Sequence, residues 1–534
     1  MKYPLAAIHR FAPLAITTAL LFCAIPAIAA TPGWSTSGVD IVGPGGSAYR
    51  ITGINWYGFE TTSYVAHGLE YHDYTYIVNE IKQYGYNTIR IPYSNAMWET
   101  DPIPNSNTIS ACPSCKGSHA RDILARIINY AGSIGLHVIL DNHRSEAGNS
   151  NEKNGLWYYV SGSNNYTEQS WLNDWTQVEA WVNGVAQTAG ATDTVTVNVN
   201  ASDGYPVVLG FDLRNEPHTP SRTAYLQGAT WGTGDGISPA TNPNPNPFSP
   251  ACVSTSKCVD WRLAAERAGD DILGEAASKG WSYPLIFVEG ISQYPSANGT
   301  PANGPYDYYW DGGELEGVNG NAGNPGAPVV LNAGGSASAL GPAVSNQLVY
   351  SAHDYGPTVY QQPWFNSSTC YHSGCSSSSL ADIWNKAWAY INTGNVNPQW
   401  SGGAYPWANT GASAYTNTPV WLGEFGTGNT SSTTTYSGNG SEGQWFVDLV
   451  NFINSSYTLT SANSSGIPVS HLQWTYWALN TEDSFALFGS NDTGLAYPFK
   501  EYSELCFDQW GPLAVPPGTG SGQCGSTGAF PNPQ

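Results

Sequence analysis

Short apolar stretches rich in β-branched residues recur along the chain and predict buried strands. They show little alternation of polar and apolar positions, which is typical of strands covered on both faces of a parallel sheet. In chain order the stretches cover residues 51–55, 88–92, 137–140, 207–213, 285–288, 348–352, 420–423 and 472–476.

Helical periodicity occupies several of the intervals between these stretches, most clearly at residues 74–84, 121–134 and 261–279. Strands that alternate with helices predict right-handed βαβ units, and eight such units close a barrel. We therefore predict an α/β fold, a (β/α)8 TIM barrel with long βα-loops. The long loops are expected in the stretches rich in Gly, Asn, Ser and Tyr at residues 144–206, 217–258, 291–347 and 354–418.

The two chain ends differ from the body of the sequence. Residues 1–30 predict a secretory signal peptide, because Lys2 and Arg10 precede an apolar run that ends in small residues. A retained membrane anchor is the alternative, which the short run and its two prolines disfavour. We predict one barrel domain over residues 31–510 and a Gly/Pro-rich tail over 511–534, in a secreted, extracellular protein.

Eight cysteines remain after removal of the signal peptide, an even number that favours disulfides in an exported chain. They form four local couples, for which we predict the pairs 112–115, 252–258, 370–375 and 506–524. The alternative is half a zinc site at Cys112 and Cys115, but the sequence offers no second half.

Charge narrows the class of partner. The chain has 18 basic and 40 acidic residues, a net charge of −22, and only 11% charged residues in total. This balance argues against nucleic acid or an anionic membrane as the partner. A neutral, hydroxyl-rich partner fits better, since the 21 tryptophans and many amide side chains can both bind one. We expect a monomer.

Polar and aromatic residues stand at or just after the ends of the predicted strands. The carboxyl ends of barrel strands meet at one mouth, where active sites are built, so we expect these residues to lie together. They are Arg90, His143, Asn215, Glu216, Glu289, His353, Tyr355, Glu424 and Trp477.

Two of these residues can account for a reaction. Glu216 follows the fourth predicted strand and Glu424 the seventh, so their carboxylates would face each other across the mouth. Such a pair can flank a glycosidic bond, with one carboxyl protonating the leaving oxygen and the other attacking the anomeric carbon. A separation of ~5–5.5 Å would give retention of configuration and one of ~6.5–9.5 Å inversion.

Eight ordered motifs between about residues 50 and 480 give the chain a family resemblance. It resembles the bacterial cellulases of glycoside hydrolase family 5, which are retaining endo-β-1,4-glucanases. The motifs are INWYGFE at 54–60, HGL at 67–69, IRIP at 89–92, NEPH at 215–218, DWRLAAER at 260–267, HDY at 353–355, WLGEFG at 421–426 and QWTYW at 473–477.

The resemblance implies a role for each matched residue. Glu216 would be the general acid/base and Glu424 the nucleophile. Arg90 and Tyr355 would hold Glu424 charged and oriented, and Asn215 would bind the 2-hydroxyl of the sugar under attack. Among the remaining residues, those that would bind the same sugar or orient the acid are His143, His353 and Trp477.

The expected role of each other tryptophan, in sugar binding or in the core, depends on its position in the sequence. Trp56 lies within a matched motif and Trp310 within a long loop, so both are expected at glucose subsites, while Trp157 is left open. We expect the core to take Trp171, Trp175 and Trp181. The direction of Arg214, two residues before Glu216, is also open. No cofactor and no metal site is predicted, although a Gly/Asn-rich loop could hold calcium without a recognisable motif.

The expected partner is a β-glucan polysaccharide such as cellulose. A β-glycanase of the same fold acting on mannan, xyloglucan or mixed-linkage glucan is the first alternative, because sequence reasoning does not resolve loop shape. A non-catalytic glycan-binding protein is the second, although two strand-end glutamates with Asn215 and Arg90 exceed what binding requires.

Overall fold

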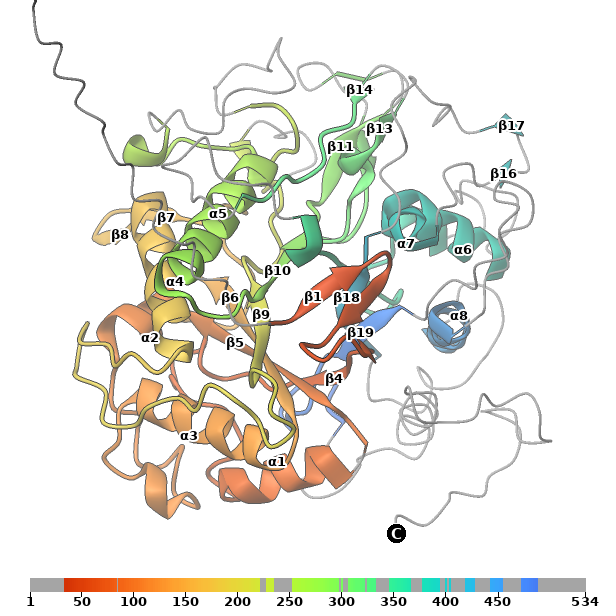
Figure 1. Cartoon of the computed structure of the whole chain (residues 1–534). Coiled ribbons are helices and arrows are strands. Elements are labelled where there is room, and N and C mark those ends of the chain that lie inside the picture. Colours follow the sequence, from red (N-terminus) through yellow and green to blue (C-terminus); the bar gives the residue numbers. More distant parts are fainter. Residues whose placement is uncertain are drawn as a thin grey trace, which may run out of the picture.

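Eight parallel strands form a closed barrel (Figure 1). The computed structural model describes residues 33–83, 85–220, 227–234, 252–296, 299–300, 306–321, 324–332, 345–365, 377–393, 399–400, 403–404, 418–427, 442–454 and 472–487. Around the barrel the strands follow chain order: β4 (Thr52–Asn55), β5 (Thr88–Ser94), β6 (His137–Arg144), β9 (Val208–Asp212), β10 (Leu285–Glu289), β15 (Leu348–Tyr355), β18 (Val420–Gly426) and β19 (Gln473–Tyr476). The predicted (β/α)8 barrel is confirmed.

Several strands continue beyond their predicted carboxyl ends. β6 runs to Arg144, β15 to Tyr355 and β18 to Gly426, and every residue of these three strands is buried. The polar residues expected just after the apolar stretches therefore belong to the strands themselves. The register between β15 and β18 places His353 opposite Glu424.

The predicted helices are present as α1 (Tyr74–Gln83), α3 (Ala120–Ser133) and α5 (Trp261–Lys279). The amino end of α5 is capped by Asp260, whose carboxylate accepts a hydrogen bond from the Leu263 amide, and Gly280 ends the helix with φ +71°.

Several described helices were not predicted, and the longest of them is α4 (Glu168–Val182). α4 lies in the stretch 144–206 that was expected to be a loop. It packs three tryptophans into the core, as expected for them, and two of their indole N–H groups donate to the Leu213 carbonyl. These three are Trp171, Trp175 and Trp181.

The remaining described elements are helices, single helical turns and two-stranded ribbons. The other helices are α2 (Asn95–Thr100), α6 (Ser377–Trp384), α7 (Tyr390–Thr393) and α8 (Glu442–Asn454), with a π-helical turn at Asn385–Ala389. Single 3-10 turns lie at Pro113–Cys115, Val253–Thr255, Glu316–Val318, Ser345–Gln347 and Pro363–Phe365. Two-stranded ribbons pair β7 (Tyr159–Ser161) with β8 (Asn164–Tyr166), β11 (Gln293–Pro295) with β12 (Tyr306–Tyr308), β13 (Gly320–Asn321) with β14 (Asn324–Pro325), and β16 (Gln399–Trp400) with β17 (Gly403–Ala404).

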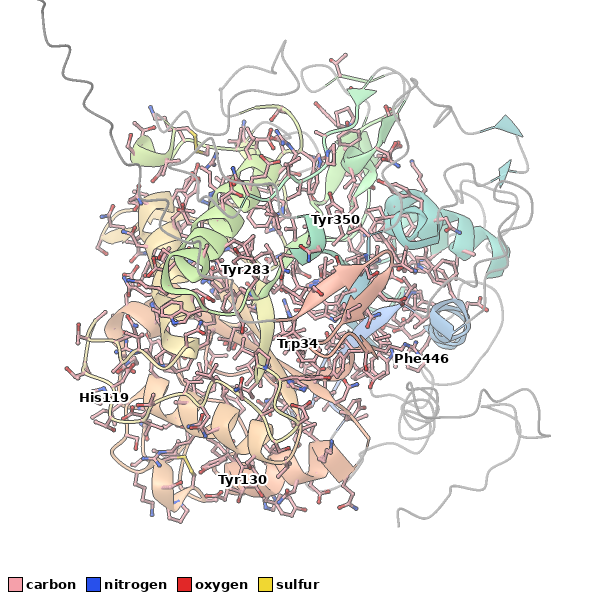
Figure 2. All side chains as sticks on the ribbon, in the orientation of Figure 1. Trp34, His119, Tyr130, Tyr283, Tyr350 and Phe446 are labelled. Atoms are coloured by element: carbon pink, nitrogen blue, oxygen red, sulfur yellow. A yellow bond between two sulfur atoms is a disulfide. The ribbon has the colours of Figure 1, made fainter. Side chains whose placement is uncertain are left out.

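A small antiparallel sheet covers the amino end of the barrel. It consists of β1 (Ser35–Ser37), β2 (Asp40–Val42) and β3 (Ala48–Tyr49), and β1 crosses in front of the barrel strands in Figure 1. Trp34, near the centre of Figure 2, packs edge-on against His137 at the start of β6, and its indole N–H donates to the Pro206 carbonyl at 3.0 Å. The apolar side chains of this sheet join those inside the barrel in one cluster, so the sheet forms a floor.

Two of the four predicted disulfides are present, Cys112–Cys115 and Cys252–Cys258. The pairs 370–375 and 506–524, the predicted signal peptide 1–30 and the tail 511–534 lie outside the described residues. Within the described part of the chain, no helix has the length and apolar character needed to cross a bilayer.

Candidate active site

The carboxyl ends of the barrel strands bring the predicted site residues together. Arg90 comes from β5, His143 from β6, His353 and Tyr355 from β15, and Glu424 from β18. The others stand at or just beyond strand ends: Asn215 and Glu216 after β9, Glu289 at the end of β10, and Trp477 after β19. Contacts among their side chains link strands on all sides of the barrel.

Glu424 is a buried carboxylate held by two strong donors. Arg90 Nη1 lies 2.6 Å from Oε1, and the Tyr355 hydroxyl donates to Oε2 at 2.7 Å. Hydrogen bonds of this length are strong and fix the position of the group that accepts them. Each oxygen of Glu424 is therefore oriented by its own donor.

Glu216 faces Glu424 from the opposite side of the mouth. Its Oε1 is 3.1 Å from His353 Nδ1, and its Oε2 accepts a hydrogen bond from Asn151 Nδ2 at 3.2 Å. One carboxylate oxygen of Glu216, one of Glu424 and a ring nitrogen of His353 all lie within 4.8 Å of one another. Glu216 is partly exposed, whereas Glu424 is buried, so the two carboxylates have different surroundings.

The backbone of Glu216 is strained. Its φ is +47°, in the left-handed region that non-glycine residues adopt only when their surroundings enforce it. The Glu216 amide donates to Glu289 Oε2 at 2.6 Å, and the Asn215 amide donates to the Asn142 carbonyl at 3.1 Å. These bonds hold the turn after β9 in the conformation that aims Glu216 at the mouth.

Arg90 stands at the centre of a buried cluster of carboxylates. Besides Glu424 it contacts Asp141 at 3.1 Å, Asp212 at 2.9 Å and Glu289 at 3.4 Å. Burial raises the pKa of Asp212 to about 7 and of Glu289 to about 8, although Arg90 opposes both shifts. Burial likewise raises the pKa of Asp141 well above its ordinary value. The cluster therefore shares protons near neutral pH while Arg90 stays charged.

The two histidines have opposite charge states. Burial lowers the pKa of His143 to about 3, so its ring is neutral and shares one proton with Asp141 across 2.6 Å. Burial also opposes the charge of His353, but the carboxylates of Glu289 and Glu424 outweigh it and raise the pKa of His353 well above its ordinary value. His353 is thus a cation beside Glu216.

Trp477 presents a partly exposed indole beside these groups. Its ring stacks on His143, with centroids 5.7 Å apart and planes inclined by 15°, and on Tyr57 at 5.4 Å and 9°. Its indole N–H donates to Asp483 at 3.1 Å, which fixes the ring plane. These contacts hold the Trp477 ring nearly parallel to the rings of His143 and Tyr57.

The other tryptophans for which a position was considered differ in burial and in their distance from the site. Trp56 is only 1% exposed and its indole N–H donates to the His67 carbonyl, so it packs in the core rather than offering a face to a sugar, contrary to expectation. Trp310 is 7% exposed and meets Tyr355 edge-on at 6.0 Å, so it adjoins the site. Trp157, which the sequence left open, is fully buried.

Arg214 points away from Glu216. It pairs with buried Glu152, in the loop after β6, at 2.8 Å and donates to buried Asn142, in β6, at 2.6 Å. The strand ends at Asp212, so strict alternation of side chains no longer relates Arg214 to Glu216.

Sequence reasoning missed several contributors. Asn151 donates both to Glu216 and, at 3.0 Å, to Asp311, so one amide group joins the glutamate to a second carboxylate. Asn151 and Asp311 lie in long loops where no strand end marks them. By contrast, Asp212 ends β9 and Asp141 directly follows the apolar stretch predicted at 137–140, and this signal could have identified them.

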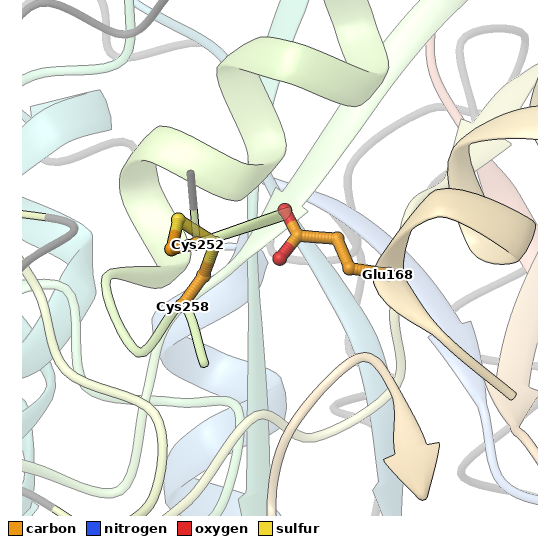
Figure 3. A group of neighbouring side chains, drawn as sticks. All are labelled: Glu168, Cys252 and Cys258. Atoms are coloured by element: carbon orange, nitrogen blue, oxygen red, sulfur yellow. A yellow bond between two sulfur atoms is a disulfide. The ribbon is translucent and has the colours of Figure 1, made fainter. Parts of the chain in front are cut away.

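Two groups of side chains have the spacing of metal ligands among the described residues. In the first, Glu168, Cys252 and Cys258 come together (Figure 3), but the sulfurs are joined in a disulfide and Glu168 pairs with Arg267 at 2.6 Å. Neither thiolate needed for zinc is therefore available. The second is Glu216, Glu424 and His353, where the charged imidazole and nearby Arg90 oppose a metal cation.

A closed (β/α)8 barrel with two facing carboxylates, one buried against arginine and one more exposed, defines a class of enzyme, the glycoside hydrolases. Within that class, residues 47–483 match the model of the cellulase family, glycosyl hydrolase family 5. The chain belongs to this family, and the resemblance found in its motifs is confirmed.

Named relatives agree with this placement. The chain is 31% identical to an endoglucanase from Paenibacillus polymyxa over 86% of its own length and 81% of the relative's. It is 30% identical to the major extracellular endoglucanase of Xanthomonas campestris, over 66% of this chain but only 55% of that one. Among solved structures, an endocellulase variant from Pyrococcus horikoshii in complex with cellotetraose superposes with a TM-score of 0.59 at 25% identity, covering 90% of this chain and 99% of the other.

Proposed function

We propose that the protein is a secreted, retaining endo-β-1,4-glucanase that hydrolyses cellulose or related β-glucans by double displacement. The observation that carries this proposal is the approach of Glu216 and Glu424, whose nearest oxygens belong to a set within 4.8 Å. Retaining enzymes place the two carboxyl groups ~5–5.5 Å apart, whereas inverting enzymes leave ~6.5–9.5 Å for a water. The closeness of the pair supports retention.

In the first step Glu424 attacks the anomeric carbon while Glu216 protonates the departing glycosidic oxygen. The C–O bond to the leaving sugar breaks, and an ester bond forms between the sugar and Glu424. Arg90 and Tyr355 keep the attacking carboxylate charged and aimed. Asn215 accepts a hydrogen bond from Arg90 through Oδ1 at 3.0 Å, which leaves its Nδ2 as the donor for the sugar 2-hydroxyl.

In the second step Glu216, now a carboxylate, takes a proton from water, which attacks the anomeric carbon and releases Glu424. Two inversions at one carbon restore the original configuration. Trp477 and neutral His143 would lie beneath the sugar throughout, and cationic His353 would steady Glu216 through both protonation states.

The relatives support the proposed substrate and mode of attack. The similar proteins from P. polymyxa and X. campestris are named endoglucanases, which supports internal cleavage of β-1,4-glucan. The test is product analysis on carboxymethylcellulose, mixed-linkage glucan, xyloglucan and mannan, with the anomer of the first product recorded by NMR. We expect the β-anomer first and a rapid fall in viscosity of the cellulose derivative. An α-anomer would refute double displacement, and cleavage of mannan alone would refute the substrate.

The roles of the two glutamates can be separated. Glu424→Ala should abolish hydrolysis but keep binding of cello-oligosaccharides, because it removes the nucleophile without touching the Trp477 platform. A variant that still hydrolyses would overturn the assignment of Glu424. A wild-type protein that binds glucan but never cleaves it would favour a binding module.

The proposal also covers cleavage of the signal peptide, the bounds of the catalytic domain and the oligomeric state. We propose that residues 1–30 are removed on export, that 31–510 form the catalytic domain, and that 511–534 form a tail outside it. The mass of the exported protein and its amino-terminal sequence test the cleavage point, and light scattering tests the expected monomer.

A further inference from the structure

Glu289 is a fully buried carboxylate that the two-glutamate mechanism does not use. It ends β10, and both of its oxygens face the catalytic groups. Oε2 accepts the backbone N–H of Glu216 at 2.6 Å. Oε1 lies 3.1 Å from His353 Nε2 and 3.4 Å from Arg90 Nη2.

These contacts converge on Glu216 by two routes. The first is direct, through the backbone amide of a residue held at φ +47°. The second passes through the imidazole of His353, which has Glu289 at Nε2 and the Glu216 carboxyl at Nδ1, 3.1 Å away on each side. Glu289 thus contacts both the main chain of Glu216 and the ring that contacts its side chain.

Gly312 encloses the first contact. A Cβ at this position would lie 2.3 Å from Glu289 Oε2 and 3.2 Å from Glu216 Cα, so only glycine leaves room for the two residues to meet. The Gly312 carbonyl accepts the Gly290 amide at 2.8 Å, which fixes the glycine against the end of β10. The pairing of Glu289 with the Glu216 backbone is therefore a built feature of the barrel mouth.

We propose that Glu289 is a positioning residue for the catalytic acid. One oxygen holds the strained backbone of Glu216, and the other holds His353 against the Glu216 carboxyl. Without this clamp the backbone of Glu216 relaxes toward negative φ, and its carboxyl swings away from the leaving oxygen. This inference rests on the proposed function, in which Glu216 is the acid.

Glu289→Gln is the sharpest perturbation, because glutamine keeps the shape but has only one acceptor oxygen. If that oxygen accepts the Glu216 amide, the glutamine NH2 faces the donors of Arg90 and His353. If the amide group turns over, the NH2 faces the Glu216 N–H instead. Either orientation breaks one route. The matched control is Glu179→Gln on α4, where an equally buried carboxylate accepts a hydrogen bond from Asn183 far from the mouth.

Two substrates separate an effect on the acid from a general loss. Cleavage of cellotetraose needs a proton on the leaving oxygen, whereas dinitrophenyl β-cellobioside releases a phenolate that needs none. The value of kcat/KM reports the first displacement for both. We expect Glu289→Gln to lower kcat/KM on cellotetraose by about 10²-fold, within the range that general acid catalysis contributes. The loss on the dinitrophenyl substrate should be about tenfold smaller, and Glu179→Gln should leave both substrates near wild type.

Equal losses on the two substrates would overturn the inference, since Glu289 would then act through Arg90 and Glu424 or through the fold. No loss on either substrate would also overturn it, as would a loss of the same size in Glu179→Gln. If Glu289→Gln does not fold, Glu289→Asp replaces it, because the shorter carboxylate keeps the charge but cannot span both contacts. The same substrate-dependent loss is then expected, and its absence is refuting.

Failure of the proposed function would look different. Glu216→Ala, run in the same series, should show the largest difference between the two substrates. If Glu216→Ala cleaves cellotetraose as well as wild type, Glu216 is not the acid and the proposed mechanism fails. If Glu216→Ala behaves as expected and Glu289→Gln does not, only the positioning role is lost.

Discussion

Replacing Arg90 with methionine tests the charge balance on which the barrel mouth depends. The guanidinium is fully buried and contacts four carboxylates, Asp141, Asp212, Glu289 and Glu424, at 3.1, 2.9, 3.4 and 2.6 Å. Methionine fills a similar volume without charge. The variant therefore removes the cation and leaves the carboxylates in place.

The size and pH dependence of the loss follow from this geometry. Leaving a buried charge without its partner costs about 3–5 kcal/mol, a large share of the ~5–15 kcal/mol typical of a folded protein. Arg90 opposes the raised pKa of Asp212 and Glu289, so its removal moves both pKa values further above their unfolded values. The folded state of the variant then holds protons that the unfolded chain releases, and stability falls as the pH rises. We expect a larger loss at pH about 8 than at pH about 5.

Urea unfolding followed by tryptophan fluorescence, at both pH values, measures this difference. The control is Arg214→Met, which removes an equally buried guanidinium that faces one carboxylate, Glu152. A larger pH dependence in Arg90→Met than in the control is expected. Equal unfolding midpoints for wild type and Arg90→Met, or a loss greater at the lower pH, would refute the reasoning.

Three further outcomes are expected. Tyr355→Phe removes one hydrogen bond to the nucleophile Glu424, and such a bond to a charged group is worth about 1.5–3 kcal/mol. The value of kcat/KM on cellotetraose should therefore fall about 10- to 150-fold, with little change in melting temperature. An unchanged kcat/KM would contradict this. The double variant Cys252→Ser, Cys258→Ser opens a loop of sequence separation 6. The free energy of unfolding, measured from melting curves, should fall by about 2–3 kcal/mol. An unchanged melting curve would mean that the bridge does not constrain the unfolded chain. In the wild type, burial raises the pKa of Asp212 to about 7 and that of Glu289 to about 8. Their contribution to the free energy of unfolding is therefore fully present below pH about 4 and is lost as the pH rises toward about 8. A melting temperature that rises over this range would contradict the assignment.

The barrel was predictable because its strands are apolar and its helices periodic. All eight predicted stretches correspond to barrel strands, and the helix expected at 261–279 has those bounds. The floor sheet of β1, β2 and β3 was missed because its strands are two or three residues long and leave no period to detect. Helix α4 was missed because weak helix formers (tryptophan, serine, asparagine, aspartate, threonine and valine) occupy much of it, and packing against the barrel decides its conformation.

Within the site, residues at strand ends could be predicted, whereas the groups that support them could not. In a (β/α)8 barrel the carboxyl ends of all strands lie at one mouth, so Arg90, Glu216 and Glu424 were expected together. The meeting of Asn151 with Asp311 depends on two loops folding against each other, for which the sequence holds no periodic signal. Trp56 was expected to bind sugar because of its motif, but the direction of a side chain just beyond a strand depends on local backbone geometry, and it turns inward.

The floor sheet has a practical consequence for how the molecule can be attached to a support. Gly33, just before β1, lies beside Tyr283 on the loop that enters β10 (Tyr283 is labelled in Figure 2), at the pole of the barrel opposite the glutamates. A tether joined to the floor sheet would leave the reactive pole facing outward into the medium. Immobilisation through this face should therefore preserve access for a long polymer chain.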